Sequence, residues 1–174
     1  MRKIKFYLIG LTFLLLNNTY SKAQGIDPKQ EAVFVYNLLR YIDWPRDDGH
    51  SDFIIEVLGK GDIVKEIQLM AAQKTVGDRK IIVKVYDDTA KLEHCHLLFI
   101  TKSHSCCLQK ARQKLKDMSA LYVTEDKGMI SKGADINFIV RDNKIMFELN
   151  EKSLNAHNLK MSNELKKFAV KVED

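Results

Sequence analysis

The sequence predicts a single-domain α/β fold, a layered sandwich in which helices flank a mixed β-sheet that carries an antiparallel hairpin near its C-terminal end. Two observations lead to this prediction. Short apolar segments rich in β-branched residues alternate with amphipathic segments of helical period, which implies parallel strands joined by crossover helices. Later in the chain, two strand-like segments are separated only by Asp142 and Asn143, and a two-residue connection joins antiparallel strands. The 174 residues fit one domain.

The first elements follow from local signals. Asp27 and Pro28 predict the N-cap and first residue of a helix, and Pro45 stops that helix because a proline disfavours helical geometry in the residue before it. A polar loop is expected from Arg46 to Ser51. Strands are then expected over residues 53–58, 80–86, 97–101 and 120–124, with a helix that has Asp62 as its N-cap and a basic helix over residues 107–116.

The last third of the chain contains the hairpin and two further helices. A loop with Gly128 and Gly133 leads into the hairpin, which occupies residues 134–150. Apolar residues at helical spacing then predict helices over about 151–157 and 162–172.

The N-terminus has the features of a secretory signal peptide. Three basic residues precede an apolar run from Phe6 to Leu16, and Ser21 and Ala23 supply small residues at the spacing that a signal peptidase accepts. The run is shorter than the ~20 residues that a membrane-spanning helix needs. We therefore expect residues 1–23 to be removed and residues 24–174 to form a domain that is exported to the periplasm.

The charge distribution argues against nucleic-acid binding. The chain carries 28 basic and 23 acidic residues, but residues 1–23 hold four of the basic ones and no acidic one. The predicted domain is thus nearly neutral. It also contains no basic run with interleaved aromatic residues, which is the pattern that phosphate backbones require of their partners.

The three cysteines leave their pairing open. An odd number means that at least one thiol is free or bonded to another chain, and export would permit disulfides. Cys95 would begin a strand and Cys106 would lie beyond the far end of that strand, which is farther than the ~7 Å Cα separation that a disulfide spans. We expect no Cys95–Cys106 disulfide. Free and mostly buried thiols are one alternative, and a vicinal or intersubunit bridge through Cys106 or Cys107 is the other.

The hairpin gathers polar side chains on one face. If Asp142 and Asn143 form the turn, period-two alternation directs one set of side chains to the apolar face: Ile136, Phe138, Val140, Ile145, Phe147 and Leu149. The opposite face then carries Asp135, Asn137 and Ile139 opposed to Met146, Glu148 and Asn150. Three interpretations remain open: a solvated outer face, a helix cap formed by Asn150, or a recognition surface.

Several motifs resemble those of one known family. The segments that carry the resemblance are Tyr41-Ile42-Asp43-Trp44-Pro45, Val57-Leu58-Gly59, Cys95-His96-Leu97-Leu98-Phe99-Ile100, Gly133 with Ile136-Asn137-Phe138, Phe147-Glu148-Leu149-Asn150, and Leu159 to Ser162. In this order and spacing, from about Val33 to Val172, the chain resembles the YfiR family of periplasmic proteins.

This resemblance implies a regulator without enzymatic activity. The best-known member represses an inner-membrane diguanylate cyclase by binding its periplasmic part, and an outer-membrane OmpA-like lipoprotein captures it in turn. The resemblance places partner contacts at Ile136, Glu148 and Leu154, and a pocket for small aromatic ligands near Asp43, Lys160 and Ser162. It also makes a homodimer plausible.

Three departures limit what the resemblance transfers. The family's paired cysteines around the loop that runs from Gly128 to Gly133 are missing here. The strand position near Glu56, where a partner for Cys95 is expected, is not a cysteine. Asp43 places an acid at the position before Trp44, which weighs against an aromatic acid as the ligand.

Catalytic and metal-binding motifs are not found in the sequence. It has no nucleophile elbow, no paired metal-binding histidines on a helix and no phosphate-binding glycine loop, so we expect no enzyme and no cofactor. His94 and His96 would share one face of a strand, but Cys95 would point away, and His104 and Cys106 would lie beyond the strand's far end. We therefore expect no metal site.

The sequence thus supports two functional hypotheses. In the first, the protein binds the periplasmic part of a membrane-bound signalling enzyme, a cyclase or a sensor kinase, through Ile136, Asn137, Glu148, Asn150 and Leu154. In the second, it binds a small aromatic molecule near Asp43, Trp44, Lys160 and Ser162. Trp44 has a structural alternative, because an aromatic residue before a proline commonly anchors the end of a helix on a sheet.

Overall fold

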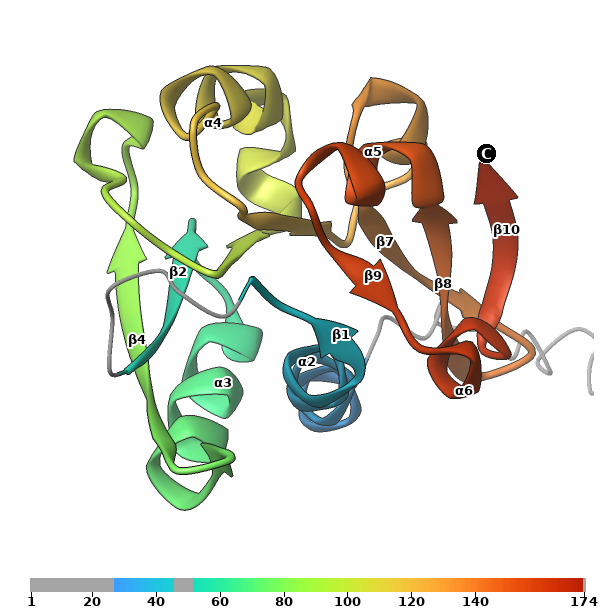
Figure 1. Ribbon diagram of the computed structural model, residues 1–174, viewed down its shortest axis with the longest axis horizontal. Helices are drawn as coiled ribbons and strands as arrows, with labels where there is room; N and C mark the ends of the chain where they lie inside the picture. The colour runs from blue at the N-terminus through green and yellow to red at the C-terminus, as the bar shows by residue number, and fades with distance from the viewer. Residues whose placement is uncertain (1–26, 46–51, 174) are drawn as a thin grey trace, which may run out of the picture.

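The computed structural model describes residues 27–45 and 52–173 and has the α/β architecture that the sequence predicts (Figure 1). The expected signal peptide, residues 1–23, and the expected loop from Arg46 to Ser51 lie outside the described residues. A mixed eight-stranded sheet runs through the centre, with helices on both faces. Each helix among the described residues is too short or too polar to span a bilayer.

The sheet combines a parallel core with antiparallel borders. Its strand order is β10-β8-β7-β6-β5-β2-β4-β3, and a separate two-stranded sheet pairs β1 with β9. The five strands from β7 to β4 run parallel, while β8 is antiparallel to β7 and β3 to β4. The strands are β1 (Ile42–Asp43), β2 (Phe53–Leu58), β3 (Thr75–Val76), β4 (Arg79–Tyr86), β5 (Leu97–Ile100), β6 (Leu121–Thr124), β7 (Ile136–Arg141), β8 (Lys144–Asn150), β9 (Lys160–Met161) and β10 (Ala169–Glu173).

The helices bury both faces of the parallel strands. The α-helices are α2 (Pro28–Tyr41), α3 (Asp62–Gln73), α4 (Leu108–Lys114), α5 (Glu151–Ala156) and α6 (Asn163–Lys166), and three short 3₁₀ helices are η1 (Thr89–Lys91), η2 (Lys102–Cys107) and η3 (Ile130–Lys132). In Figure 1, α2 and α3 lie below the sheet and α4 lies above it. Alternate residues of β5 accordingly enter two cores: Leu97 and Phe99 pack with α2 and α3, and Leu98 and Ile100 pack with α4.

The start of α2 agrees with the sequence signals, but its end does not, because the helix stops at Tyr41, before the residue that Pro45 constrains, and Ile42 and Asp43 pair with β9 as the strand β1. Asp27 caps the helix, because its carboxylate accepts a hydrogen bond from the Lys29 amide (3.1 Å). After the helix ends at Tyr41, the indole nitrogen of Trp44 donates back to the Leu39 carbonyl (3.0 Å), and its ring packs edge-on against Phe53 with centroids 4.9 Å apart. The structural interpretation of Trp44 is confirmed, since the side chain fixes the helix end against β2.

The hairpin forms in the predicted register. Asp142 and Asn143 have φ angles of 51° and 58°, the left-handed geometry that a two-residue turn of this kind requires. Asn137 consequently pairs with Glu148 across the ladder, and Phe138 pairs with Phe147. The prediction of which hairpin side chains share the apolar face is therefore confirmed.

Two further local predictions need correction, and three short strands were not predicted at all. Asp62 is the first residue of α3 and Gly61 occupies the N-cap position. The helix expected over 107–116 is shorter and follows the 3₁₀ helix η2. The strand pair β1 and β9 and the short strand β3 were not anticipated, because two-residue strands leave no periodic pattern.

The largest error concerns the C-terminus, where the helix expected over 162–172 divides into α6 and the strand β10. Val170 and Val172 favour an extended chain, and the outer edge of β8 offers unpaired backbone groups to which β10 hydrogen-bonds in parallel. Tertiary pairing thus overrides the helical spacing of the apolar residues.

Candidate functional site

A chain of hydrogen bonds crosses three strands beneath the polar face of the hairpin. The buried hydroxyl of Thr124 on β6 donates to Asn137 Oδ1 (2.7 Å), and Asn137 Nδ2 on β7 donates to Glu148 Oε2 on β8 (2.9 Å). Thr124 and Asn137 are 0% exposed, whereas Glu148 is half-buried. One carboxylate oxygen of Glu148 is thus held at the surface by the buried Asn137 amide, which Thr124 holds in turn, and this restricts the direction of its charge.

Glu148 lines a surface groove between the hairpin and the loop that follows β6. This hairpin groove has a volume of about 570 Å³ and is lined by Lys102, Glu125, Asp126, Lys127, Gly128, Phe138, Ile139, Val140 and Glu148. Two of its acidic residues are already bonded: Glu125 accepts from the Lys102 amide (2.9 Å) and Asp126 from the Ser105 hydroxyl (2.8 Å). Val140 is 38% exposed, so an apolar edge borders the charged residues.

Three of the predicted partner-binding residues do not reach the surface. Ile136, Asn137 and Leu154 are each 0% exposed, and Ile136 and Leu154 lie in the core that α2 and α3 share with the sheet. Their side chains therefore offer no direct contact to a partner in this conformation. The error has a simple cause: shared motifs identify positions, but burial depends on the packing around them.

Asn150 has the structural role that its position suggested. Its Oδ1 accepts from the Ser153 amide (2.8 Å) and so caps α5. Among the predicted contact residues, Glu148 alone is both accessible and lines the groove.

Asp135 does not join Glu148 but anchors a separate buried network. Its carboxylate accepts from the Tyr122 amide (2.7 Å) and the Ser153 hydroxyl (2.5 Å), and it lies 3.7 Å from Arg112 Nη1 and 3.5 Å from His157 Nδ1. Because Asp135 is 0% exposed, these contacts replace its hydration. The network ties α4 and α5 to the residue that precedes β7.

A second buried carboxyl lies beside the groove, on α2. Glu31 is only 1% exposed, and its Oε1 has no hydrogen-bond partner in the part of the chain that the structure describes. Burial, with a smaller contribution from Glu125, raises the pKa of Glu31 to about 9. Burial also raises the pKa of Glu125. Sequence reasoning missed Glu31, because a glutamate in the first turn of a helix is ordinarily solvated.

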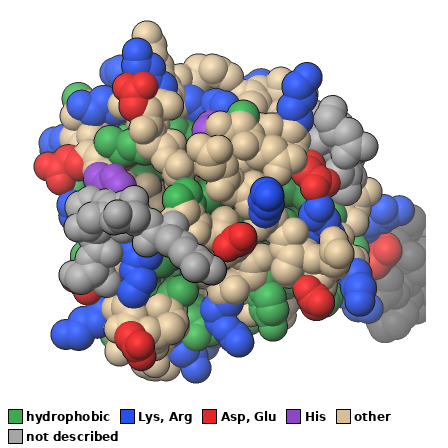
Figure 2. Space-filling model, viewed as in Figure 1, with side chains coloured by type: hydrophobic (Ala, Val, Ile, Leu, Met, Phe, Trp, Pro, Cys, Tyr) green, Lys and Arg blue, Asp and Glu red, His purple; other side chains and the backbone are tan. Residues whose placement is uncertain are grey.

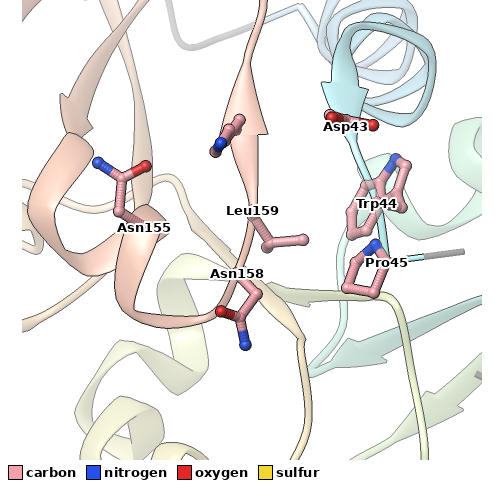
Figure 3. A pocket seen from close by; sticks show the side chains of 7 residues that line it. Asp43, Trp44, Pro45, Asn155, Asn158 and Leu159 are labelled. Atoms are coloured by element: carbon pink, nitrogen blue, oxygen red, sulfur yellow. The ribbon is translucent and has the colours of Figure 1, made fainter.

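The predicted ligand residues do come together, around the small β1–β9 sheet. Asp43 pairs with Lys160 across this sheet, and the two residues line a pocket of about 640 Å³ together with Trp44, Pro45, Asn155, Asn158 and Leu159. Figure 3 shows Trp44 and Leu159 facing each other across this β1–β9 pocket, with Asn155 and Asn158 on the α5 side. The pocket thus combines an apolar wall with amide and charged groups.

Ser162 lies next to this pocket and not in its lining. It borders an adjoining hollow of about 420 Å³ that also includes Asp43 and Lys160. Its hydroxyl accepts from the Leu165 amide (3.4 Å) and caps α6, so it has a structural role as well.

Cys95 is buried against Glu56, the position at which its bonding partner was expected. The two side chains are hydrogen-bonded, and burial is the largest cause that raises the pKa of each. Cys95, Cys106 and Cys107 are all free thiols. Over residues 27–45 and 52–173, no three His, Cys, Asp or Glu side chains converge in a way that could hold a metal ion.

Leu154→Ala tests whether Leu154 supports the core or contacts a partner. Removing a fully buried leucine should lower the free energy of unfolding by about 2–5 kcal/mol, because transfer and cavity terms both act against the variant. Urea denaturation of the wild type and the variant measures this difference. An unchanged stability would instead show that Leu154 does not support the core.

Glu31→Gln tests the buried carboxyl. The pKa of Glu31 is about 9 in the folded protein and near 4.5 when unfolded, so between these values only the folded state keeps the proton and stability falls as pH rises. A glutamine has no proton to lose, so the variant should be more stable than the wild type at pH 8, by about 1–3 kcal/mol, and equal to it near pH 4. Denaturation between pH 4 and pH 9 measures this. Parallel curves for the two proteins would contradict the buried, protonated state.

Comparison with known proteins identifies the family. A search of the curated proteins finds no match. Among solved structures, the chain is similar to the crystal structure of a conserved domain protein from Vibrio cholerae O1 biovar eltor, with a TM-score of 0.56 and 9% identity over 86% of this chain. The chain spans 62% of that structure's length, and at this identity the likeness shows the fold alone. The model of the YfiR/HmsC-like family matches residues 28–170, and the chain belongs to this family.

Proposed function

We propose that this protein is a periplasmic regulator that represses a membrane-bound signalling enzyme by binding the enzyme's periplasmic part. Membership in the YfiR/HmsC-like family supports a regulator of this kind, with a diguanylate cyclase as the first candidate and a sensor kinase as the second. The proposal also includes an outer-membrane OmpA-like lipoprotein that competes for the regulator. It further includes a homodimer as the oligomeric state of the regulator. The observation that carries it is the oriented carboxylate of Glu148 in the hairpin groove.

The contact surface in this proposal is smaller than the sequence suggested. Glu148 supplies a charge whose direction is set by Asn137, and the exposed edge of Val140 and the half-buried Ile139 supply apolar area beside it. A fixed charge next to an apolar surface is the combination that protein interfaces use for their strongest contacts. Ile136, Asn137, Asn150 and Leu154 act indirectly, because they hold the hairpin and α5 in place.

The mechanism in this proposal is a shift of population. Binding to the sensor's periplasmic part represses the enzyme only if affinity for the inactive state exceeds affinity for the active one. A partner that captures the regulator at the same surface would release the enzyme by mass action.

Two variants of Glu148 separate the charge from the local structure. Glu148→Gln keeps an acceptor for the buried Asn137 amide but removes the charge, so stability should change little while repression weakens more than tenfold, which is the loss expected for a charge pair at an interface. Glu148→Lys should abolish repression and also destabilise the fold by about 1–3 kcal/mol, because it leaves Asn137 without its acceptor. Cellular cyclic di-GMP in a deletion strain that expresses each variant measures repression.

The matched control is Asp78→Lys. Asp78 is exposed next to the β3–β4 turn, at the edge of the sheet opposite the hairpin, and the substitution changes the net charge by the same amount as Glu148→Lys. The Asp78→Lys variant should repress the enzyme as strongly as the wild type does. Full repression by Glu148→Gln at wild-type protein levels would refute the role of the charge.

The β1–β9 pocket supports a second candidate function, the binding of a small aromatic molecule. Its volume lies in the range of ligand sites, and the half-buried Trp44 supplies apolar area while the exposed Asn155 and Asn158 supply amides. Asp43 and Lys160 bring both signs of charge to the same rim, which suits a zwitterion better than a simple acid.

A thermal-shift series with aromatic amino acids tests this second candidate. A true ligand raises the midpoint of unfolding in proportion to the logarithm of its excess concentration. Asn155→Ala and Lys160→Gln should reduce the shift, while Lys167→Gln, an exposed lysine outside the pocket, should not. If no compound raises the midpoint, or if all three variants respond like the wild type, the pocket is not a binding site for this class of molecule.

A further inference from the structure

Two adjacent cysteines lie at the junction of η2 and α4, and no function described above uses them. Cys106 is exposed and Cys107 is half-buried at the N-cap position of α4, and their sulfur atoms are 3.9 Å apart. Both thiols are free. Cys95, by contrast, is 1% exposed and its thiol is hydrogen-bonded to Glu56. It therefore provides an unreactive reference thiol in the same chain.

We propose that Cys106 and Cys107 are a modification site, at which exchange with a small-molecule disulfide forms a vicinal disulfide and reshapes the rim of the hairpin groove. The two sulfur atoms need only approach from 3.9 Å to the ~2.05 Å of a disulfide, and no loop has to close. Adjacent Cα atoms are ~3.8 Å apart, less than the ~4.4–6.8 Å that disulfides favour. The bridge is therefore strained, and strained, accessible disulfides are the readily reduced ones.

The chemistry takes place in two exchange steps. The Cys106 thiolate attacks one sulfur of the small disulfide and expels a thiolate, which leaves a mixed disulfide on Cys106. The Cys107 thiolate then attacks the Cys106 sulfur and expels the second thiolate, which closes the ring. Two cysteine thiols are oxidised by two electrons, the small disulfide is reduced to two thiols, and the two cysteine protons end on those thiols. Cys106 reacts first because it is the exposed member of the pair.

Two hydrogen bonds connect this site to the hairpin groove. Within η2, the Lys102 amide donates to Glu125 (2.9 Å) and the Ser105 hydroxyl donates to Asp126 (2.8 Å), and both acceptors line the groove. Closing the ring pulls the last turn of η2 out of its 3₁₀ geometry, because the two side chains must turn toward each other. The loop that carries Glu125 and Asp126 then loses its support from η2. This inference stands whether or not the groove binds a partner.

Peptide mapping after exposure to oxidised glutathione tests the proposal. Trypsin releases residues 103–110 with Cys106 and Cys107 as the only cysteines, and residues 92–102 with Cys95 alone. We expect the first peptide to lose the mass of two hydrogen atoms and to carry no glutathione. Excess reduced glutathione should restore its original mass. The second peptide should stay unmodified. In Cys107→Ser, Cys106 should retain one glutathione, because no resolving thiol is present.

Amide NMR of the same samples tests the connection to the groove. On oxidation, the amide resonances of Lys102, Glu125 and Asp126 should shift in the wild type and stay in place in Cys107→Ser, because these residues lie at the two hydrogen bonds that join η2 to the groove. Two glutathiones on one peptide, a link between two chains, or an unmodified peptide would each overturn the modification site. Oxidation without a shift at Lys102, Glu125 and Asp126 would overturn the proposed change in the groove.

Discussion

The turn at Asp142 and Asn143 is the constraint on which the candidate site depends. Its left-handed φ angles fix the register of β7 against β8, and a slip of one residue would move every side chain of a strand to the opposite face. With this register, Phe138 and Phe147 enter the core, while Asn137 stands directly opposite Glu148. The geometry of the hairpin groove therefore follows from two residues that lie outside it.

Two buried polar networks then determine how firmly the hairpin is held. Thr124 and Asn137 connect β6 to β8 beneath the groove, and Asp135 connects β7 to α4 and α5 through Arg112 and Ser153. Buried polar groups of this kind are costly when their bonds are incomplete, so they favour a single arrangement of the elements around them. Basic and acidic side chains are interspersed on the face seen in Figure 2, so surface charge there provides no comparable organisation.

Local patterns predicted most of the fold, but they predicted the site only in part. The N-cap at Asp27, the strand β2 and the register of the hairpin depend on neighbours in sequence, and each was predicted correctly. The strand β10 was not, because its extended form depends on the free edge of β8. The burial of Ile136, Leu154 and the Glu31 carboxyl also depends on distant elements. Asp43 and Lys160 lie side by side in the structure, but in the sequence only the family's motifs linked them. Their strands, β1 and β9, are too short to be detected from a periodic pattern.

The parallel pairing of β10 with β8 limits how any protein could approach the hairpin. Without β10, the outer edge of β8 would display unpaired amides and carbonyls, and another chain could add a strand there, as many peptide-binding domains allow. The strand β10 already occupies that edge, and a shift in its register interrupts the ladder between Ala169 and Lys171. A partner that docks on the hairpin, as proposed, would therefore have to use side chains and shape there, because the free edge of the sheet on this side belongs to β10 and not to β8.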